Sequence, residues 1–124
     1  MSDLLYKDEV FQLTGLCMEI HRRLGKGYDE VIYKDALTVE LNHANIPFSR
    51  EKQYTITYKN VILPHSYQAD FVISDKILFE AKAVEKLADA HTKQVLNYLA
   101  VSKLRLGLLV NFGAESLEWK RIIL

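Results

Sequence analysis

The sequence has little of several features that would narrow its function at once. Cys17 is the only cysteine in 124 residues, so an internal disulfide and a cysteine-rich zinc site are both excluded. Because Cys17 lies in an apolar helical stretch, we expect a buried thiol. No run reaches the ~20 apolar residues of a membrane span, and the N-terminus has no hydrophobic signal region. These absences predict a cytoplasmic protein that does not enter a membrane.

An excess of charge of one sign is also absent. Lys and Arg number 16, as do Asp and Glu, which gives a formal net charge of +0. Domains that bind nucleic acid non-specifically are usually basic overall, so this balance argues against such a binder but leaves room for local basic patches. Hydrophobic residues make up 49% of the chain, enough for one domain over residues 1–124 to build a core without disulfides.

Hydrophobic periodicity divides the chain into helices and strands. A period near 3.6 predicts helices over residues 8–24, 28–44 and 85–101. Alternating or continuous apolar runs predict strands over residues 53–58, 67–73, 77–84, 106–112 and 119–124, and Pro64 is expected to break the run that follows Asn60. The order α-α-β-β-β-α-β-β predicts an α/β fold with a mixed central sheet flanked by helices.

Charged residues inside two of these apolar strands are the most informative feature. Asp70 lies within Tyr-Gln-Ala-Asp-Phe-Val-Ile, and Glu80 and Lys82 lie within Ile-Leu-Phe-Glu-Ala-Lys-Ala-Val. Ionised side chains rarely occupy such strands without a partner. Two carboxylates and an ammonium group on one sheet are the groups needed to hold a divalent metal and activate a water molecule.

The hairpin between these strands determines whether the charges meet. A three-residue loop at 74–76 would pair Ile73 with Ile77 and set Asp70 opposite Glu80. Period two then predicts a polar-cluster face (Gln68, Asp70, Val72, Leu78, Glu80, Lys82) and an apolar face (Ala69, Phe71, Ile73, Phe79, Ala81, Ala83). A two-residue loop would separate the charges. Opposed carboxylates ~5 Å apart repel, so both a metal site and a metal-free ion network including Lys82 stay open.

Further polar residues on the predicted helices have the spacing to join this cluster. His91, Gln94 and Tyr98 project from one side of the third helix, which we expect to cross the sheet that carries Glu80. Glu30, near the start of the second helix, is a third candidate carboxylate. A solvated helix flank for the first three, and a helix-dipole charge for Glu30, are the alternatives that periodicity does not separate.

The combined motifs resemble the PD-(D/E)XK nuclease superfamily, in its branch with a Q-x-x-x-Y helix. The matching residues are Asp70, then Glu80-Ala81-Lys82, then Gln94 through Tyr98. The segment Gly27-x-x-Glu30-x-x-Tyr33 is similar to the small bacterial and archaeal family called GxxExxY proteins. Ala69 stands where the name-giving proline would be, at a position that varies in the superfamily. The resemblance implies a restriction-endonuclease-like core over nearly the whole chain.

The same resemblance implies a nuclease that hydrolyses nucleic acid, DNA in preference to RNA, through water activated by Mg²⁺ or Mn²⁺. By that analogy Lys82 positions the water and stabilises charge on the phosphate, Gln94 and Tyr98 support the site, and the metal ligands are Glu30, Asp70 and Glu80. One alternative is a catalytically inactive module of this fold that binds nucleic acid or a protein partner. Another is a subunit of a homodimer or larger complex whose partner supplies substrate binding.

Overall fold

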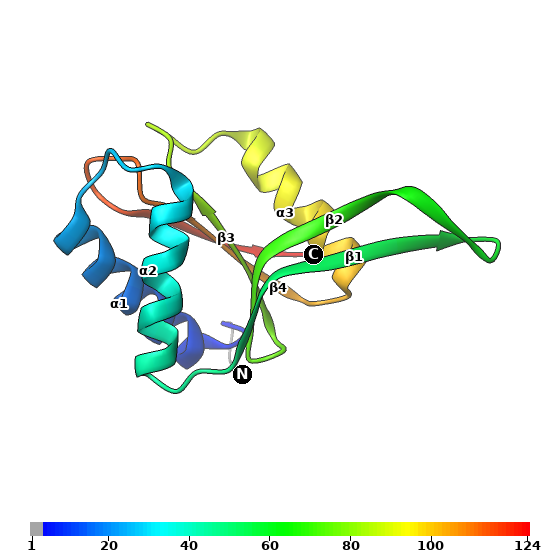
Figure 1. Cartoon of the computed structure of the whole chain (residues 1–124), viewed down its shortest axis with the longest axis horizontal. Coiled ribbons are helices and arrows are strands. Elements are labelled where there is room, and N and C mark those ends of the chain that lie inside the picture. The colour runs from blue at the N-terminus through cyan, green and yellow to red at the C-terminus, as the bar shows by residue number, and fades with distance from the viewer. Residues whose placement is uncertain (1–3) are drawn as a thin grey trace.

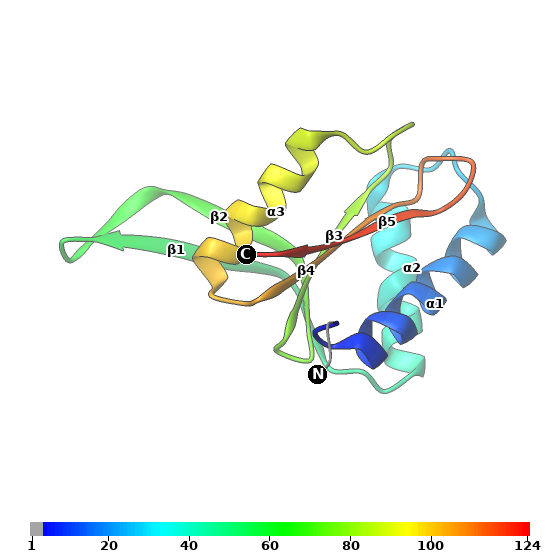
Figure 2. The ribbon, with the colours of Figure 1, turned by 180° about the vertical axis from the view of Figure 1, so that it is seen from behind.

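A computed structural model describes residues 4–124 and shows a five-stranded sheet between helices (Figure 1). Helices α1 and α2 cover one face of the sheet and α3 covers the other (Figure 1, Figure 2). The spatial order is β1-β2-β3-β4-β5, with β3 and β4 parallel and the other neighbours antiparallel. The predicted element order and mixed sheet are confirmed. The elements are α1 (Lys7–Leu24), α2 (Glu30–His43), β1 (Phe48–Tyr58), β2 (Val61–Ile73), β3 (Ile77–Lys82), α3 (Asp89–Ser102), β4 (Leu106–Asn111) and β5 (Glu118–Ile123).

The helix boundaries follow from local chemistry. Helix α1 ends at Gly25, whose φ of 68° suits glycine and whose N–H donates to the carbonyl of His21. Helix α2 begins at Glu30 rather than at residue 28, because Asp29 has an extended backbone. Helix α3 begins at Asp89 rather than at residue 85. Residues 83–88 instead form an irregular connection whose backbone groups bond to side chains at the end of β4 and the start of β5.

The β2–β3 hairpin has the three-residue loop that the sequence predicted. Ile73 pairs with Ile77, and the N–H of Lys76 donates to the carbonyl of Ile73 at 3.0 Å. Ser74 and Asp75 both adopt φ of 55°, so the loop turns in left-handed conformations without a glycine. The register that brings Asp70 to Glu80 is therefore present.

Strands β1 and β2 are longer than predicted and extend beyond the sheet. They pair from Phe48↔Ile73 to Tyr58↔Val61, whereas β3 pairs only with residues 71–73 of β2. Residues 52–69 therefore project as a two-stranded extension, here called the β1–β2 ribbon (Figure 1, Figure 2). The expectation that Pro64 ends the strand is wrong. The missing N–H is tolerated because β2 has a free edge here and its ladder with β1 is irregular.

Two clusters of buried side chains occupy the two faces of the sheet. The α1/α2 face holds the larger one: Val10, Leu13, Cys17, Ile20, Tyr33, Leu37, Leu41, Phe71, Ile73, Ile77, Phe79, Ala81, Leu106, Leu108, Val110 and Phe112. The α3 face holds Ala69, Val72, Leu78, Val95, Leu99, Leu109 and Ile122. The predicted burial of Cys17 is confirmed. No helix within residues 4–124 is both long enough and apolar enough to cross a membrane.

The side-chain alternation of β1 and β2 reverses where the ribbon leaves the sheet. Ala69 was predicted to share a face with Phe71, but it packs in the α3 cluster while Phe71 packs in the α1/α2 cluster. On β1, Arg50 lies over the Phe71 ring, whereas Lys52 lies over the ring of Tyr54 on the α3 side. The prediction that Ala69 shares a face with Phe71 is therefore wrong, because the alternation of side chains is interrupted between these two residues. The reversal falls at Asp70 and at Glu51, whose φ of 55° is unusual for a strand.

Candidate functional site

The carboxylates of Asp70 and Glu80 interlock where β2 and β3 part. The N–H of Asp70 donates to Glu80 Oε2 at 2.7 Å, and the N–H of Ala81 donates to Asp70 Oδ2 at 2.9 Å. Each carboxylate thus bonds to the backbone of the strand that carries the other, beyond the last regular pair at Phe71↔Phe79. The two acids that the sequence predicted to face each other do meet.

Glu80 is an unusually buried acid. Only 2% of it is exposed, on a strand whose other residues are also mostly buried. Burial first, and then the charge of Asp70, raise the pKa of Glu80 to about 8, although the Asp70 N–H and the charges of Lys82 and Lys34 act in the opposite direction. The cationic groups around Glu80 therefore fall short of balancing its negative charge.

Lys34 on α2 belongs to the site, and the sequence analysis missed it. Its Nζ lies 3.1 Å from Asp70 Oδ1 and 3.5 Å from Glu51 Oε1, and its side chain is 11% exposed. Burial acts to lower the pKa of Lys34, but the contact with Asp70 outweighs it and the pKa is raised. The available signal was the spacing of Glu30 and Lys34, four apart on one helix face beside the buried Tyr33 and Leu37.

Glu30 begins α2 and lies within electrostatic range of the same cluster. Burial raises its pKa, and the charges of Lys82, Asp70 and Lys34 also act on it. Within residues 4–124, however, no three His, Cys, Asp or Glu side chains lie close enough to ligate one ion. The structure brings Asp70 and Glu80 together with Glu30 in range, and the role of Glu30 as a third ligand stays a prediction.

Lys82 closes strand β3 two residues after Glu80. Its strand position pairs with Asn111 of β4, and its carbonyl accepts the N–H of Phe112 at 2.8 Å. Its charge acts on both Glu80 and Glu30, so the ammonium group belongs to the same electrostatic cluster. Its predicted role at a phosphate stays a prediction.

Of the predicted residues on α3, Tyr98 lies within electrostatic range of the two acids, and Gln94 bonds to it. Gln94 Nε2 donates to the hydroxyl of Tyr98 at 3.4 Å, and the Tyr98 ring packs edge-on against Tyr67 with centroids 5.4 Å apart. Burial raises the pKa of Tyr98, and the charges of Glu80 and Asp70 raise it further. His91 instead accepts the N–H of Ala88 through Nδ1 at 2.9 Å, so this ring nitrogen caps the start of α3.

Asn111, also missed by the sequence analysis, fixes the chain that follows Lys82. This fully buried amide accepts the N–H of Val84 at 2.9 Å and donates to the Val84 carbonyl at 2.9 Å. It also donates to Glu118 Oε1 at 2.9 Å and accepts the N–H of Gly113 at 3.0 Å. A Cβ at Gly113 would overlap the Val84 backbone. The usable signal was an asparagine at the end of an otherwise apolar strand.

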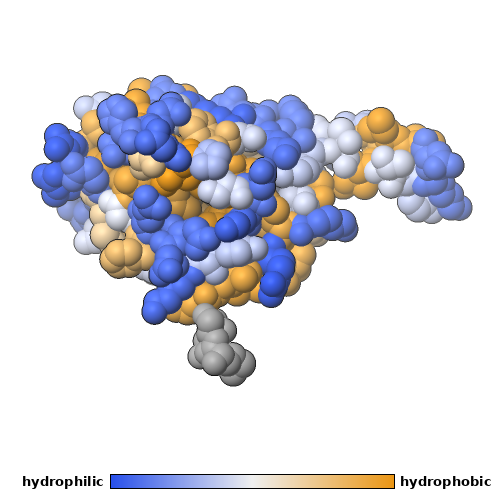
Figure 3. All heavy atoms as spheres, turned by 90° about the horizontal axis from the view of Figure 1, so that it is seen from below, coloured by the Kyte–Doolittle hydropathy of each residue, from blue (hydrophilic) through white to orange (hydrophobic). Residues whose placement is uncertain are grey.

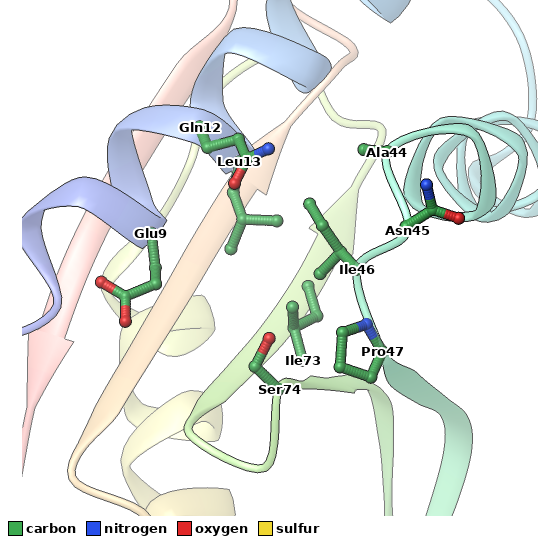
Figure 4. Close-up of a pocket in the computed structure, with 9 residues that line it drawn as sticks. All are labelled: Glu9, Gln12, Leu13, Ala44, Asn45, Ile46, Pro47, Ile73 and Ser74. Carbon is green, nitrogen blue, oxygen red and sulfur yellow. The ribbon is translucent and has the colours of Figure 1, made fainter.

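A separate cavity of about 250 Å³ lies at the opposite end of β3, beside the hairpin loop (Figure 4). It is lined by α1, by the connection between α2 and β1, and by Ile73 and Ser74. Glu9 is the one acid among its lining residues, and it already pairs with Lys76 at 3.1 Å. This cavity has neither the paired acids nor the lysine of the Asp70–Glu80 site.

The mixed sheet, with paired carboxylates and a lysine where β2 and β3 part, defines a nuclease-like α/β protein. The family model described as "PD-(D/E)XK nuclease superfamily" matches residues 7–122, and the chain belongs to this superfamily.

A solved structure titled "Crystal structure of SSO0001" shares the fold, with a TM-score of 0.61 and 20% sequence identity. The match covers 74% of this chain and 48% of that one, so the chain spans about half of that protein's length. A search of curated proteins finds no match.

Proposed function

We propose that the protein is a metal-dependent phosphodiesterase that hydrolyses nucleic acid, with DNA preferred over RNA. The observation that carries this proposal is the interlocked pair of Asp70 and Glu80 beside Lys82, in a chain of the PD-(D/E)XK superfamily. The preference for DNA rests on the resemblance alone.

The residues present fit a hard divalent cation such as Mg²⁺ or Mn²⁺. Mg²⁺ is commonly bound by one or two carboxylates, with water and substrate oxygens completing its shell. Asp70 and Glu80 supply those carboxylates, and Glu30 is the third acid in range. The raised pKa of Glu80 indicates that burial disfavours its ionised form, and a bound cation would stabilise that form. When bound, such an ion supplies Lewis-acid polarisation of the phosphodiester and a lower pKa for water.

The side chains around the acids have complementary roles in this proposal. Lys82 places a positive charge where negative charge develops on the phosphate. Lys34 holds Asp70 through its ion pair at 3.1 Å and limits the repulsion between Asp70 and Glu80. Gln94 and Tyr98 carry neutral hydrogen-bond donors suited to orienting a phosphate oxygen or a water molecule.

The test is a cleavage assay on single-stranded, duplex and branched DNA and on RNA, with Mg²⁺ or Mn²⁺. The wild type should cleave DNA, and Asp70→Asn and Lys82→Ala should each lower kcat by about 10³-fold. Asp75→Asn is the matched control, because asparagine tolerates the left-handed φ of this loop residue. Cleavage by Asp70→Asn at the wild-type rate would refute the assignment.

The second candidate is a catalytically inactive module of the same fold that binds nucleic acid or a protein, alone or within an oligomer. Two observations favour it: Lys34 already pairs with Asp70, and residues 4–124 contain no ready group of three ligating side chains. This candidate predicts nucleic-acid or protein binding without metal-dependent cleavage. It is excluded if Asp70→Asn abolishes a cleavage activity that Asp75→Asn retains.

A further inference from the structure

The β1–β2 ribbon and helix α3 lie side by side and share an unusual charge distribution. They are in contact along the ribbon, and Figures 1 and 2 show both running away from β3 in the same direction. Residues 52–69 and 90–105, the second of which leaves out only Asp89 at the start of α3, contain none of the chain's 16 Asp and Glu residues. They do contain five of its 16 Lys and Arg residues: Lys52, Lys59, Lys93, Lys103 and Arg105. The neutral net charge of the chain therefore conceals a positive region.

The ribbon combines this positive charge with two lysine-paired tyrosines, Tyr58, which is exposed, and Tyr54, which is half-buried. Lys52 lies 5.5 Å from the centroid of the Tyr54 ring, and Lys59 lies 5.6 Å from that of Tyr58. Tyr58 at the tip is 60% exposed. Lysine–tyrosine pairs suit a single nucleic-acid strand, because the ammonium group binds a phosphate while the ring face stacks on a base.

The rest of the ribbon surface carries neutral hydrogen-bonding side chains together with the exposed Val61 and Ile62 at the tip. On the face opposite Tyr54, Gln53 Nε2 donates to Gln68 Oε1 at 3.0 Å, and the hydroxyl of Ser66 donates to Gln53 Oε1 at 3.3 Å. On the side of α3, a concavity of about 350 Å³ lies between residues 55–57 and the end of the helix, where it includes Lys103. Figure 3 shows the projection standing out from the body of the molecule, with hydrophilic residues at its end and hydrophobic residues beside them.

The ribbon is joined to the candidate site by aromatic contact. Tyr67 of the ribbon packs edge-on against Tyr98 of α3, whose pKa is raised first by burial and then by the charges of Glu80 and Asp70. Asp70 follows the last residue of the ribbon directly. At ~3.3 Å per residue, the seven residues from Lys52 to Tyr58 reach roughly 20 Å from the site.

We propose that the surface formed by the β1–β2 ribbon and α3, the ribbon–α3 track, binds a single nucleic-acid strand and leads it to Asp70 and Glu80. This proposal rests on the proposed function, since it names the substrate-binding surface of the same site. A second copy of the chain is the competing occupant, because Val61 and Ile62 at the tip are 60% and 66% exposed. Pairing of two ribbons is disfavoured, because it would bring lysines together with no acid to match them.

The test measures binding of a fluorescein-labelled oligothymidylate by anisotropy over a range of salt concentrations, in Asp70→Asn protein so that cleavage does not interfere. Lys52→Gln/Lys59→Gln should weaken binding about tenfold and reduce the slope of log K against log salt by about 1.4, for two lost phosphate contacts. Tyr58→Ala should weaken it about tenfold through lost stacking, with little change in slope.

The control is Lys7→Gln/Lys26→Gln, which removes the same charge from exposed positions on and just beyond α1. It should bind within about twofold of the parent protein, because it leaves the track's phosphate contacts in place. The proposal is overturned if the two double variants bind alike. It is also overturned if Tyr58→Ala binds normally but lowers the mass seen by sedimentation, since the tip would then be an interface between copies.

The outcomes separate this proposal from the proposed hydrolysis. Binding that depends on Lys52 and Lys59, in a wild-type protein that cuts no substrate with any metal, supports the track and refutes the hydrolysis. Cleavage with a KM unaffected by Lys52→Gln/Lys59→Gln supports the hydrolysis and refutes the track. If both hold, the ribbon variant raises KM and leaves kcat unchanged.

Discussion

The two faces of the sheet differ in what they bury. Among residues 4–124, the α1/α2 face gathers sixteen buried residues, including Tyr33 stacked on Phe112 at 4.8 Å and Phe71 edge-on to Phe79 at 5.8 Å. The α3 face gathers seven, and its polar neighbours include Glu80 and Asn111. Because net stability is a small difference between large terms, one dense apolar face allows the other to carry buried charge. Most of the stabilising apolar burial therefore lies on the α1/α2 face, although α2 also supplies Lys34 and Glu30 to the candidate site.

The largest expected effect is on the apolar face. Phe79→Ala should lower the free energy of unfolding by about 4 kcal/mol, because a fully buried ring leaves a cavity. Urea denaturation measures this directly. Phe11→Ala is the matched control, since Phe11 is 80% exposed and its loss should change stability by less than about 0.5 kcal/mol. Equal losses would show that the α1/α2 face is not where stability is concentrated.

The next largest effect concerns Glu80, on the α3 face, which should make the free energy of unfolding depend on pH. Its pKa rises from an ordinary 4.5 to about 8, so between these values the folded state binds more protons than the unfolded state. The stabilisation of the folded state by protonated Glu80 is therefore complete below pH 4.5 and is lost as the pH rises through 8. At about 1.4 kcal/mol per pH unit within this window, we expect a fall of about 3 kcal/mol in the free energy of unfolding between pH 5 and pH 7 in metal-free buffer.

Glu80→Gln should flatten this profile in urea denaturation and should raise stability at pH 8. Glu115→Gln is the control, because Glu115 is exposed and its pKa is lowered by its hydrogen bond to Lys26. A wild-type profile that is flat between pH 5 and 9 would mean that Glu80 ionises normally.

A smaller effect is expected where the Asn111 side chain anchors the connection of residues 83–88. Asn111→Ala removes four hydrogen bonds and leaves the Val84 backbone groups without their partner, which should cost about 2 kcal/mol. Thermal and urea denaturation both report it. Asn97→Ala on the exposed side of α3 should be neutral or slightly stabilising, because alanine favours a helix. A neutral Asn111→Ala would show that residues 83–88 need no such anchor.

The smallest effect is stabilisation by metal. Mn²⁺ at ten times its Kd should raise the free energy of unfolding by about 1.4 kcal/mol at pH 8, detected as a higher melting temperature. The response should shrink at pH 5, because Glu80 is then protonated and a protonated carboxylate is a poor ligand. Asp70→Asn should not respond, whereas Asp75→Asn should respond as the wild type does. An equal response in both variants would place the ion elsewhere.

The sequence predicts most of the fold and part of the site. Periodicity locates the helices and strands of residues 4–124 in their order along the chain, because each element buries one stripe or face. It fails at Ala69, where the alternation reverses, and just before α3, where Asn111 and Glu118 hold the backbone of Val84 and Leu87 in an irregular connection. The Asp70–Glu80 contact was predictable from hairpin register. The ion pair of Lys34 was not, because its partners come from strands far along the chain.

The reversal at Glu51 and Asp70 also determines where the chain can change length. Residues 71–79 alternate in step with the two packed faces, so one inserted residue there would turn buried side chains outward. Beyond the reversal, the side chains of the ribbon alternate independently of the two packed faces of the sheet. The ribbon joins the sheet only at its base. Relatives should therefore show insertions and deletions of the hairpin tip around residues 57–62 while the spacing from Asp70 to Glu80 stays at ten residues.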